Sequence, residues 1–126
     1  MTDTPWTGDA CSLVDAFRSG ERTPLDELDV TVRRIRVESL PLQMFDSLEP
    51  GDFLFIDSSH VIRPQGDVLC EFLEVLPILK SGVVVHIHDI FTPRDYPRAW
   101  VVDKVRLWNE QYLLEALLTD NHGCRI

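Results

Sequence analysis

The sequence predicts an α/β fold in which helices flank a parallel sheet. Two short apolar runs carry this prediction, one at residues 52–57 and the other at residues 82–88. Each is rich in β-branched or aromatic residues and follows a Pro-Gly or Ser-Gly pair, which is typical of a buried strand. Residues 66–80, between them, have apolar side chains at helical spacing. A strand, a helix and a second strand in this order form a right-handed βαβ unit with parallel strands. We expect a sheet of three or four strands.

The part of the chain before the first buried strand carries weaker sequence signals of secondary structure. Residues 1–29 are a poorly defined segment, in which residues 9–17 have the apolar pattern of a short helix. Residues 30–37 alternate with a period of about two, which predicts an edge strand. Residues 42–48 are expected to form a short helix or turn. We therefore divide the chain into the segment 1–29 and an α/β part at residues 30–126.

Two helices are predicted on the flanks of the sheet. The first spans residues 66–80, and Pro77 should kink it or trim its last turn because proline lacks a backbone N–H. The second is a long amphipathic helix over residues 98–119, which the Asn-His-Gly sequence at residues 121–123 ends.

Composition excludes several classes of partner. The 126 residues suit one domain, and 21 acidic against 12 basic residues give a formal net charge of −9. Phosphate binding needs clustered Lys and Arg, so this charge argues against nucleic-acid or anionic-membrane binding. The arginines at residues 33–36 are read as a solvated strand edge. No apolar stretch approaches the roughly 20 residues that span a bilayer, and no signal peptide is seen.

The three cysteines are an odd number without metal-ligand spacing. We read them as reduced thiols, which predicts a cytoplasmic protein. Cys70 lies in the apolar pattern of the first helix and is expected in the core.

Polar side chains gather where the two predicted strands end. Asp57 and His60 follow the first strand, and His88 and Asp89 follow the second. In open parallel sheets this edge binds ligands. Two neighbouring carboxylates repel unless a proton or a cation such as Mg²⁺ lies between them. The alternative is that both aspartates cap the following loops or helices.

The histidines allow several roles. His60 could take a proton from a hydroxyl, or be a loop histidine bonded to backbone. His88, at the rim, could be a ligand, whereas His86 lies deeper and is expected in the core. A His-x-His pair also suits zinc, but a third protein ligand would be required. The polar residues Asn109 and Glu110 lie in an aromatic patch, and their partners cannot be named from sequence.

These residues resemble a known family. The runs GDFLFIDSSHVIRPQGDV, LPILKSGVVVHIHDIFTPRDYPRAWV and WNEQYLLEALL look like the carboxyl-terminal half of a class I S-adenosylmethionine-dependent methyltransferase. The most similar group includes sugar and macrolide O-methyltransferases and relatives of cephalosporin hydroxylase. The resemblance covers about residues 35–121. It implies a partial doubly wound, Rossmann-like parallel sheet and methyl transfer to a small-molecule oxygen.

The resemblance also implies roles for individual residues. In metal-dependent members, acidic residues at these two strand ends bind Mg²⁺, and the histidine three positions after the first aspartate is the general base. Carried over, Asp57 and Asp89 become metal ligands, His60 becomes the catalytic base, and His88 stands where a glutamate often ligates. The implied cofactors are S-adenosylmethionine and, in the metal-dependent members, Mg²⁺.

The sequence departs from the family at its cofactor half. It has no Gly-rich turn after an early apolar strand, and Ser39 stands where relatives often carry an aspartate. We therefore expect a truncated domain that binds S-adenosylmethionine weakly alone, and that self-associates or needs a partner chain to complete its sheet. The alternative is a non-catalytic α/β fragment or half of a split enzyme. A metal-dependent hydrolase ranks last, because no nucleophile is visible.

Overall fold

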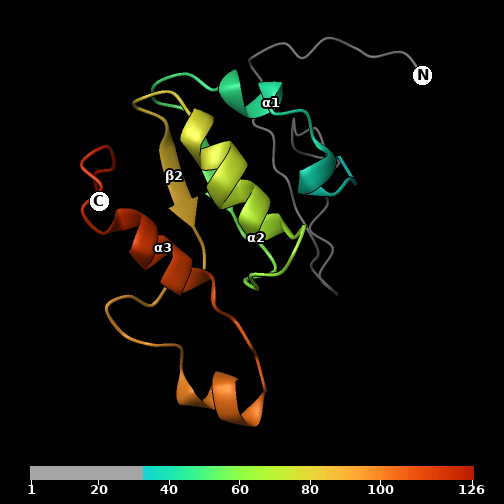
Figure 1. Cartoon of the computed structure of the whole chain (residues 1–126), viewed down its shortest axis with the longest axis vertical. Coiled ribbons are helices and arrows are strands. Elements are labelled where there is room, and N and C mark those ends of the chain that lie inside the picture. The colour runs from blue at the N-terminus through green and yellow to red at the C-terminus, as the bar shows by residue number, and fades with distance from the viewer. Residues whose placement is uncertain (1–32) are drawn as a thin grey trace, which may run out of the picture.

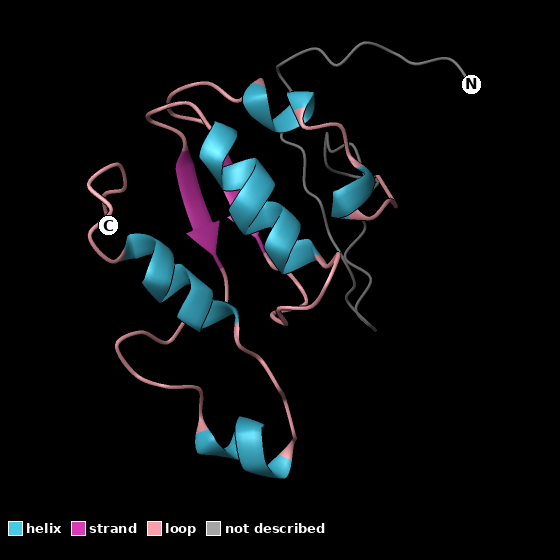
Figure 2. Cartoon of the chain, viewed as in Figure 1, coloured by secondary structure: helices cyan, strands magenta, loops and turns pink. Residues whose placement is uncertain are grey.

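The computed structural model describes residues 33–126. Its elements in chain order are the 3₁₀ turn η2 (Val37–Ser39), α1 (Gln43–Asp46), β1 (Phe53–Ile56), α2 (Asp67–Cys70), the π-helical η3 (Glu71–Val75), the 3₁₀ turn η4 (Leu76–Ile78), β2 (Val84–Ile87), the π-helical η5 (Ala99–Asp103) and α3 (Glu110–Leu118). Figures 1 and 2 show the long helix that begins with α2 crossing one face of the strands, with α3 beside the end of β2.

The predicted βαβ unit is confirmed. β1 and β2 pair in parallel, with Phe53 opposite Val84 and Ile56 opposite Ile87. The strands are brought together at their amino ends by two glycines in left-handed conformation, where the Gly51 N–H donates to the Gly82 carbonyl at 2.8 Å. A Cβ on Gly82 would lie 2.9 Å from the Pro50 side chain, so this close approach favours glycine. The fold is thus an α/β fold with a parallel sheet and flanking helices, consistent with a partial Rossmann-like domain.

The crossover helix behaves as the sequence predicts. α2, η3 and η4 follow one another without interruption, and the 3₁₀ turn that contains Pro77 ends the helix. Three of its buried side chains, Val68, Phe72 and Val75, are each at most 2% exposed. Cys70 belongs to the core cluster with Val75, as expected, and Leu54 of β1 packs against that cluster. One face of the sheet is therefore buried under this helix.

The prediction of one helix over residues 98–119 is wrong. η5 ends at Asp103, Val105 has a φ of +52°, and α3 begins at Glu110. The intervening chain is bonded elsewhere: the backbone N–H groups of Asn109 and Glu110 both donate to the His60 carbonyl, at 2.9 and 3.3 Å. This tertiary contact replaces the helical bonds that the amphipathic pattern alone would favour. In Figure 1, η5 lies in the orange segment away from the sheet.

Other expectations fail or fall outside the described residues. Residues 33–37 form no strand, because Val37 instead begins η2 and buries its side chain in the core cluster. The described chain contains a two-stranded sheet, fewer than the three or four strands expected. The predicted helix at residues 9–17, the segment 1–29 and residues 30–32 lie outside the described residues. Within residues 33–126, no helix has the length and apolar character to cross a membrane.

The second face of the sheet leaves apolar side chains exposed. Phe53 is 58% exposed and Val84 50%, and the exposed His86 stacks on Phe55 with ring centroids 4.9 Å apart. The expectation that His86 lies in the core is therefore wrong, because its position in the strand places it on this face. Aromatic surface of this kind favours association in water.

Self-association of the chain remains a prediction. Substitutions on the exposed face of the sheet can test it. Light scattering should rise with protein concentration, and Phe53→Ser with Phe55→Ser should reduce both scattering and hydrophobic-dye binding. Leu73→Ser, which removes another exposed apolar side chain, is the matched control. Equal scattering from all three proteins would contradict the role of this face.

Candidate active site

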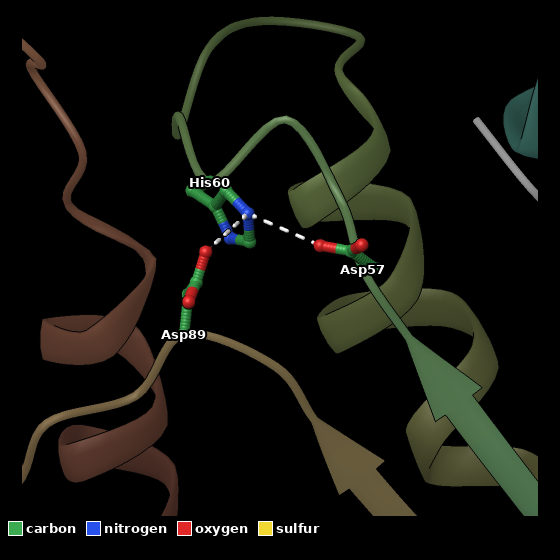
Figure 3. A group of neighbouring side chains, drawn as sticks. All are labelled: Asp57, His60 and Asp89. Carbon is green, nitrogen blue, oxygen red and sulfur yellow. Dashed lines mark ion pairs between the residues drawn. The ribbon is translucent and has the colours of Figure 1, made fainter. Parts of the chain in front are cut away.

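Asp57, His60 and Asp89 converge at the carboxyl end of the two strands (Figure 3). His60 Nε2 lies 3.4 Å from Asp57 Oδ1 and 3.8 Å from Asp89 Oδ2. One donor atom from each residue lies within 4.8 Å of the others, so the three could share one cation. His60 and Asp89 both have positive φ, at 58° and 57°, which turns the chain sharply after each strand. Such backbone conformations are uncommon for non-glycine residues and cluster at functional sites.

Glu110 orients the imidazole of His60. Its side chain is fully buried, and Oε2 lies 2.8 Å from His60 Nδ1. The Ser58 hydroxyl donates to the same oxygen at 2.9 Å and accepts the His60 backbone N–H at 3.0 Å. A neutral His60 that donates its Nδ1 proton to Glu110 presents an unprotonated Nε2 to the two aspartates. A buried carboxylate behind a histidine is the common device that fixes ring orientation and tautomer.

The charges around His60 favour its protonated form. Burial lowers the pKa of His60, but the Glu110 hydrogen bond and the charges of Glu110, Asp57 and Asp89 outweigh burial and raise that pKa above its ordinary value. Three carboxylates around one imidazole make the site attractive to positive charge. A cation held by the two aspartates would oppose that effect on His60.

Asp67 fixes the loop that carries His60. It accepts two hydrogen bonds of 2.6 Å from Ser59, one from the backbone N–H and one from the hydroxyl. Burial raises the pKa of Asp67, but these bonds and the one from the Val68 N–H outweigh it, and the pKa is lowered. Asn109 holds the far side of the loop by accepting the Ile62 N–H at 2.6 Å. The loop is therefore anchored at both ends before any ligand binds.

His88 lies at the rim of the site, beside both aspartates. Its Nδ1 is 3.3 Å from Asp89 Oδ1 and 3.6 Å from Asp57 Oδ1. This nitrogen is buried and has no hydrogen-bond partner among the described residues. Within residues 33–126, the group that could share a cation comprises Asp57, His60 and Asp89, and His88 is not one of the three. All four residues predicted from sequence are nevertheless brought to one edge of the sheet.

A cavity of about 570 Å³ opens over these side chains. Its size lies in the range of small-molecule sites. Its lining includes the following residues: Asp57, His60, His88, Asp89, Arg106 and Trp108. The Trp108 ring packs on His60, with ring centroids 4.1 Å apart. The cavity thus combines an acidic group, an imidazole and an aromatic wall.

The sequence predicts the strand-end residues but not the residues that support them. Glu110 lies in an aromatic patch of the sequence, and its partner His60 lies 50 positions away. Asp67 could have been found from its place at the start of a helix, where carboxylates commonly satisfy backbone N–H groups. No pattern in the sequence predicts the hydrogen bonds between Asp67 and Ser59.

A comparison with protein families identifies the family to which the chain belongs. The family described as "Methyltransferase domain" matches residues 7–90, two thirds of the chain. The match includes Asp57, His60, His88 and Asp89, and it begins inside the segment that the sequence left poorly defined. No curated protein and no solved structure matches the chain significantly. The sheet, the strand-end cavity and this match agree, and the chain belongs to the methyltransferase domain family.

Proposed function

We propose that the chain transfers a methyl group from S-adenosylmethionine to a hydroxyl oxygen of a small molecule. The observation that carries the proposal is the convergence of Asp57, His60 and Asp89 under one cavity, with Glu110 orienting His60 from behind. S-adenosylmethionine, when bound, supplies an electrophilic methyl carbon and leaves as a neutral thioether. His60 takes the hydroxyl proton at Nε2 as the acceptor oxygen bonds to that carbon.

Asp57 and Asp89 fit a divalent cation such as Mg²⁺. Both offer hard oxygen ligands that are only partly exposed, and the unpartnered Nδ1 of His88 faces them. When bound, the ion would favour the ionised form of an acceptor hydroxyl. His60 Nε2 faces the same carboxylates, so it is either the base or a third metal ligand. We propose the base, because in the neutral ring Glu110 accepts the Nδ1 proton and leaves Nε2 to take a proton, and because a hard ion prefers oxygen.

Measurements of metal binding distinguish a His60 that acts as the base from a His60 that acts as a metal ligand. Asp57→Asn and Asp89→Asn should each weaken Mn²⁺ binding, measured by electron paramagnetic resonance, about tenfold or more, because each removes a charged oxygen ligand. His60→Gln should change Mn²⁺ affinity little if His60 is the base. Asp52→Asn, at the opposite end of β1, is the matched control. A loss of affinity in His60→Gln equal to that in the aspartate variants would make His60 a ligand.

Glu110 should act through His60. Glu110→Gln is expected to lower methyl transfer about 10- to 100-fold, since an outer partner orients the group that reacts. The ¹⁵N shifts of the His60 ring should show a changed tautomer population, which loss of stability alone would not produce. Glu115→Gln, on the same helix, is the control. An unchanged tautomer with full activity would remove Glu110 from the proposal.

The acceptor is proposed to be a small molecule on grounds of size and charge. The cavity holds about 570 Å³, and a net charge of −9 opposes contact with nucleic acid or an anionic membrane. The same proposal includes a narrower assignment of the chain to the O-methyltransferase group. It also assigns residues 30–126 to the carboxyl-terminal half of such a domain. It is supported by the Asp-x-x-His and His-Asp sequences at the two strand ends.

A further inference from the structure

The break between η5 and α3 places an arginine against a pair of indoles, Trp100 and Trp108, which contact each other edge to face with ring centroids 5.1 Å apart. The Arg106 guanidinium carbon lies 4.4 Å from the ring centroid of Trp100 and 4.6 Å from that of Trp108. The backbone N–H of Arg106 donates to the Trp100 carbonyl at 2.8 Å, which fixes the turn. Val105 just before it has a φ of +52°, a conformation that β-branched residues rarely adopt. The chain thus takes up an unfavourable backbone conformation where it presents Arg106.

The Arg106 side chain has no carboxylate partner within residues 33–126. The other two arginines that line the cavity are paired, Arg36 with Glu38 at 2.9 Å and Arg63 with Asp67 at 3.5 Å. A guanidinium held against an aromatic ring keeps N–H groups at its edge available, and its planar fork matches an oxyanion. As far as residues 33–126 show, Arg106 is therefore a preorganised cation whose donors are available to a ligand.

Arg106 and the acidic cluster line the same cavity. Trp108 contacts Arg106 and also packs on the His60 ring at 4.1 Å, so one indole separates the cation from the proposed base. A ligand in this cavity could therefore meet the carboxylates of Asp57 and Asp89 and also the Arg106 guanidinium.

We propose that Arg106 binds an anionic group, a carboxylate or a phosphate, on the molecule that accepts the methyl group. This inference rests on the proposed function, because it places the oxyanion on the acceptor. The acceptor would then be a hydroxylated acid whose hydroxyl faces His60 and whose oxyanion faces Arg106. The carboxylate of S-adenosylmethionine offers the same chemistry, and the experiment must separate the two sources.

The test measures oxyanion binding without requiring turnover. The probes are 4-fluorobenzoate and neutral 4-fluorobenzamide, titrated into the full chain and followed by ¹⁹F NMR in the presence of a chelator, so that no metal contributes. We expect 4-fluorobenzoate to bind more tightly than the amide. Arg106→Gln should weaken benzoate binding about tenfold or more, since it removes a charge-assisted hydrogen-bond pair. Arg106→Lys should weaken it less, because it keeps the charge but loses the fork. Arg98→Gln, an exposed arginine beside η5, is the matched control and should leave binding unchanged.

Calorimetric titration with S-adenosylmethionine gives the second arm. Arg106→Gln should leave whatever affinity the chain has for this cofactor unchanged. Weakened cofactor binding with unchanged benzoate binding would assign Arg106 to the cofactor and overturn the proposal. Equal binding of benzoate and benzamide, or equal benzoate binding by the wild-type chain and both Arg106 variants, would overturn it as well. Thermal unfolding of each variant shows whether a loss of binding reflects misfolding. If Arg106→Gln does not fold, the benzoate affinity of Arg106→Lys decides the outcome. None of these readouts depends on methyl transfer, so the proposed function can fail separately.

Discussion

Replacing His60 with glutamine should lower methyl transfer about 10²- to 10⁴-fold, the usual effect of removing a general base. The reason is geometric: Nε2 is the ring nitrogen that faces the cavity and the two aspartates, while Nδ1 is bonded to Glu110. Glutamine can keep a hydrogen bond to Glu110 but cannot take a proton near neutral pH. The measurement is release of S-adenosylhomocysteine in the presence of hydroxylated small molecules, at millimolar S-adenosylmethionine because the sequence lacks a Gly-rich turn.

His86→Gln is the matched control for that substitution. His86 lies on the exposed face of β2, stacked on Phe55 and away from the cavity lining. Its replacement should leave the rate within about twofold, because surface substitutions usually perturb little. If His60→Gln retained the wild-type rate with an intact fold, His60 would not be the base and the proposed mechanism would be wrong.

Replacing Glu71 with glutamine should remove a large part of the pH dependence of stability. Glu71 is buried on the crossover helix, and its Oε2 has no hydrogen-bond partner among the described residues. Burial raises the pKa of Glu71 to about 8, and the charges of Glu110, Asp67 and Glu38 act in the same direction. The group is therefore protonated in the folded protein at neutral pH.

The sign of the effect follows from proton binding in the two states. Between about pH 4.5 and about pH 8 the unfolded chain has lost the Glu71 proton while the folded chain keeps it. This group therefore makes the free energy of unfolding fall as pH rises, by about 1.4 kcal/mol per pH unit across that interval. Below about pH 4.5 both states hold the proton and the contribution is constant.

Urea unfolding between pH 5 and pH 8 measures this slope. Glu71→Gln should flatten it, so that the variant gains stability relative to the wild type as pH rises. Glu74→Gln, an exposed neighbour on the same helix, should leave the slope unchanged. Parallel pH profiles for the wild type and Glu71→Gln would show that Glu71 is ionised in the folded protein near neutral pH.

The βαβ core could be predicted because its signals are local. Each strand is a short β-branched or aromatic run, and the crossover helix shows its buried stripe and its proline stop within the residues that form it. Parallel pairing then follows from the connection, and it brings Asp57 and Asp89 to the same edge. Fold class and the position of the site are thus consequences of chain order.

The failed prediction of one helix over residues 98–119 has a physical cause, which is competition from a distant partner. The amphipathic period of residues 98–119 is compatible with one helix, but Asn109 and Glu110 donate their backbone N–H groups to His60 instead. Arg106 reaches the cavity because the chain breaks there. An apolar pattern reports which side chains prefer burial, and it does not report which backbone groups a remote loop will bond.

The strands, the crossover and the residue types at the strand ends follow from the sequence, because they depend on the hydrophobicity and conformational preferences of neighbouring residues. The position of Glu110 behind His60 and the anchoring of the His60 loop by Asp67 arise only in the folded domain. Those features depend on contacts between residues up to 50 positions apart. Such contacts are selected by the free energy of the whole packed domain, and a window of sequence does not contain them.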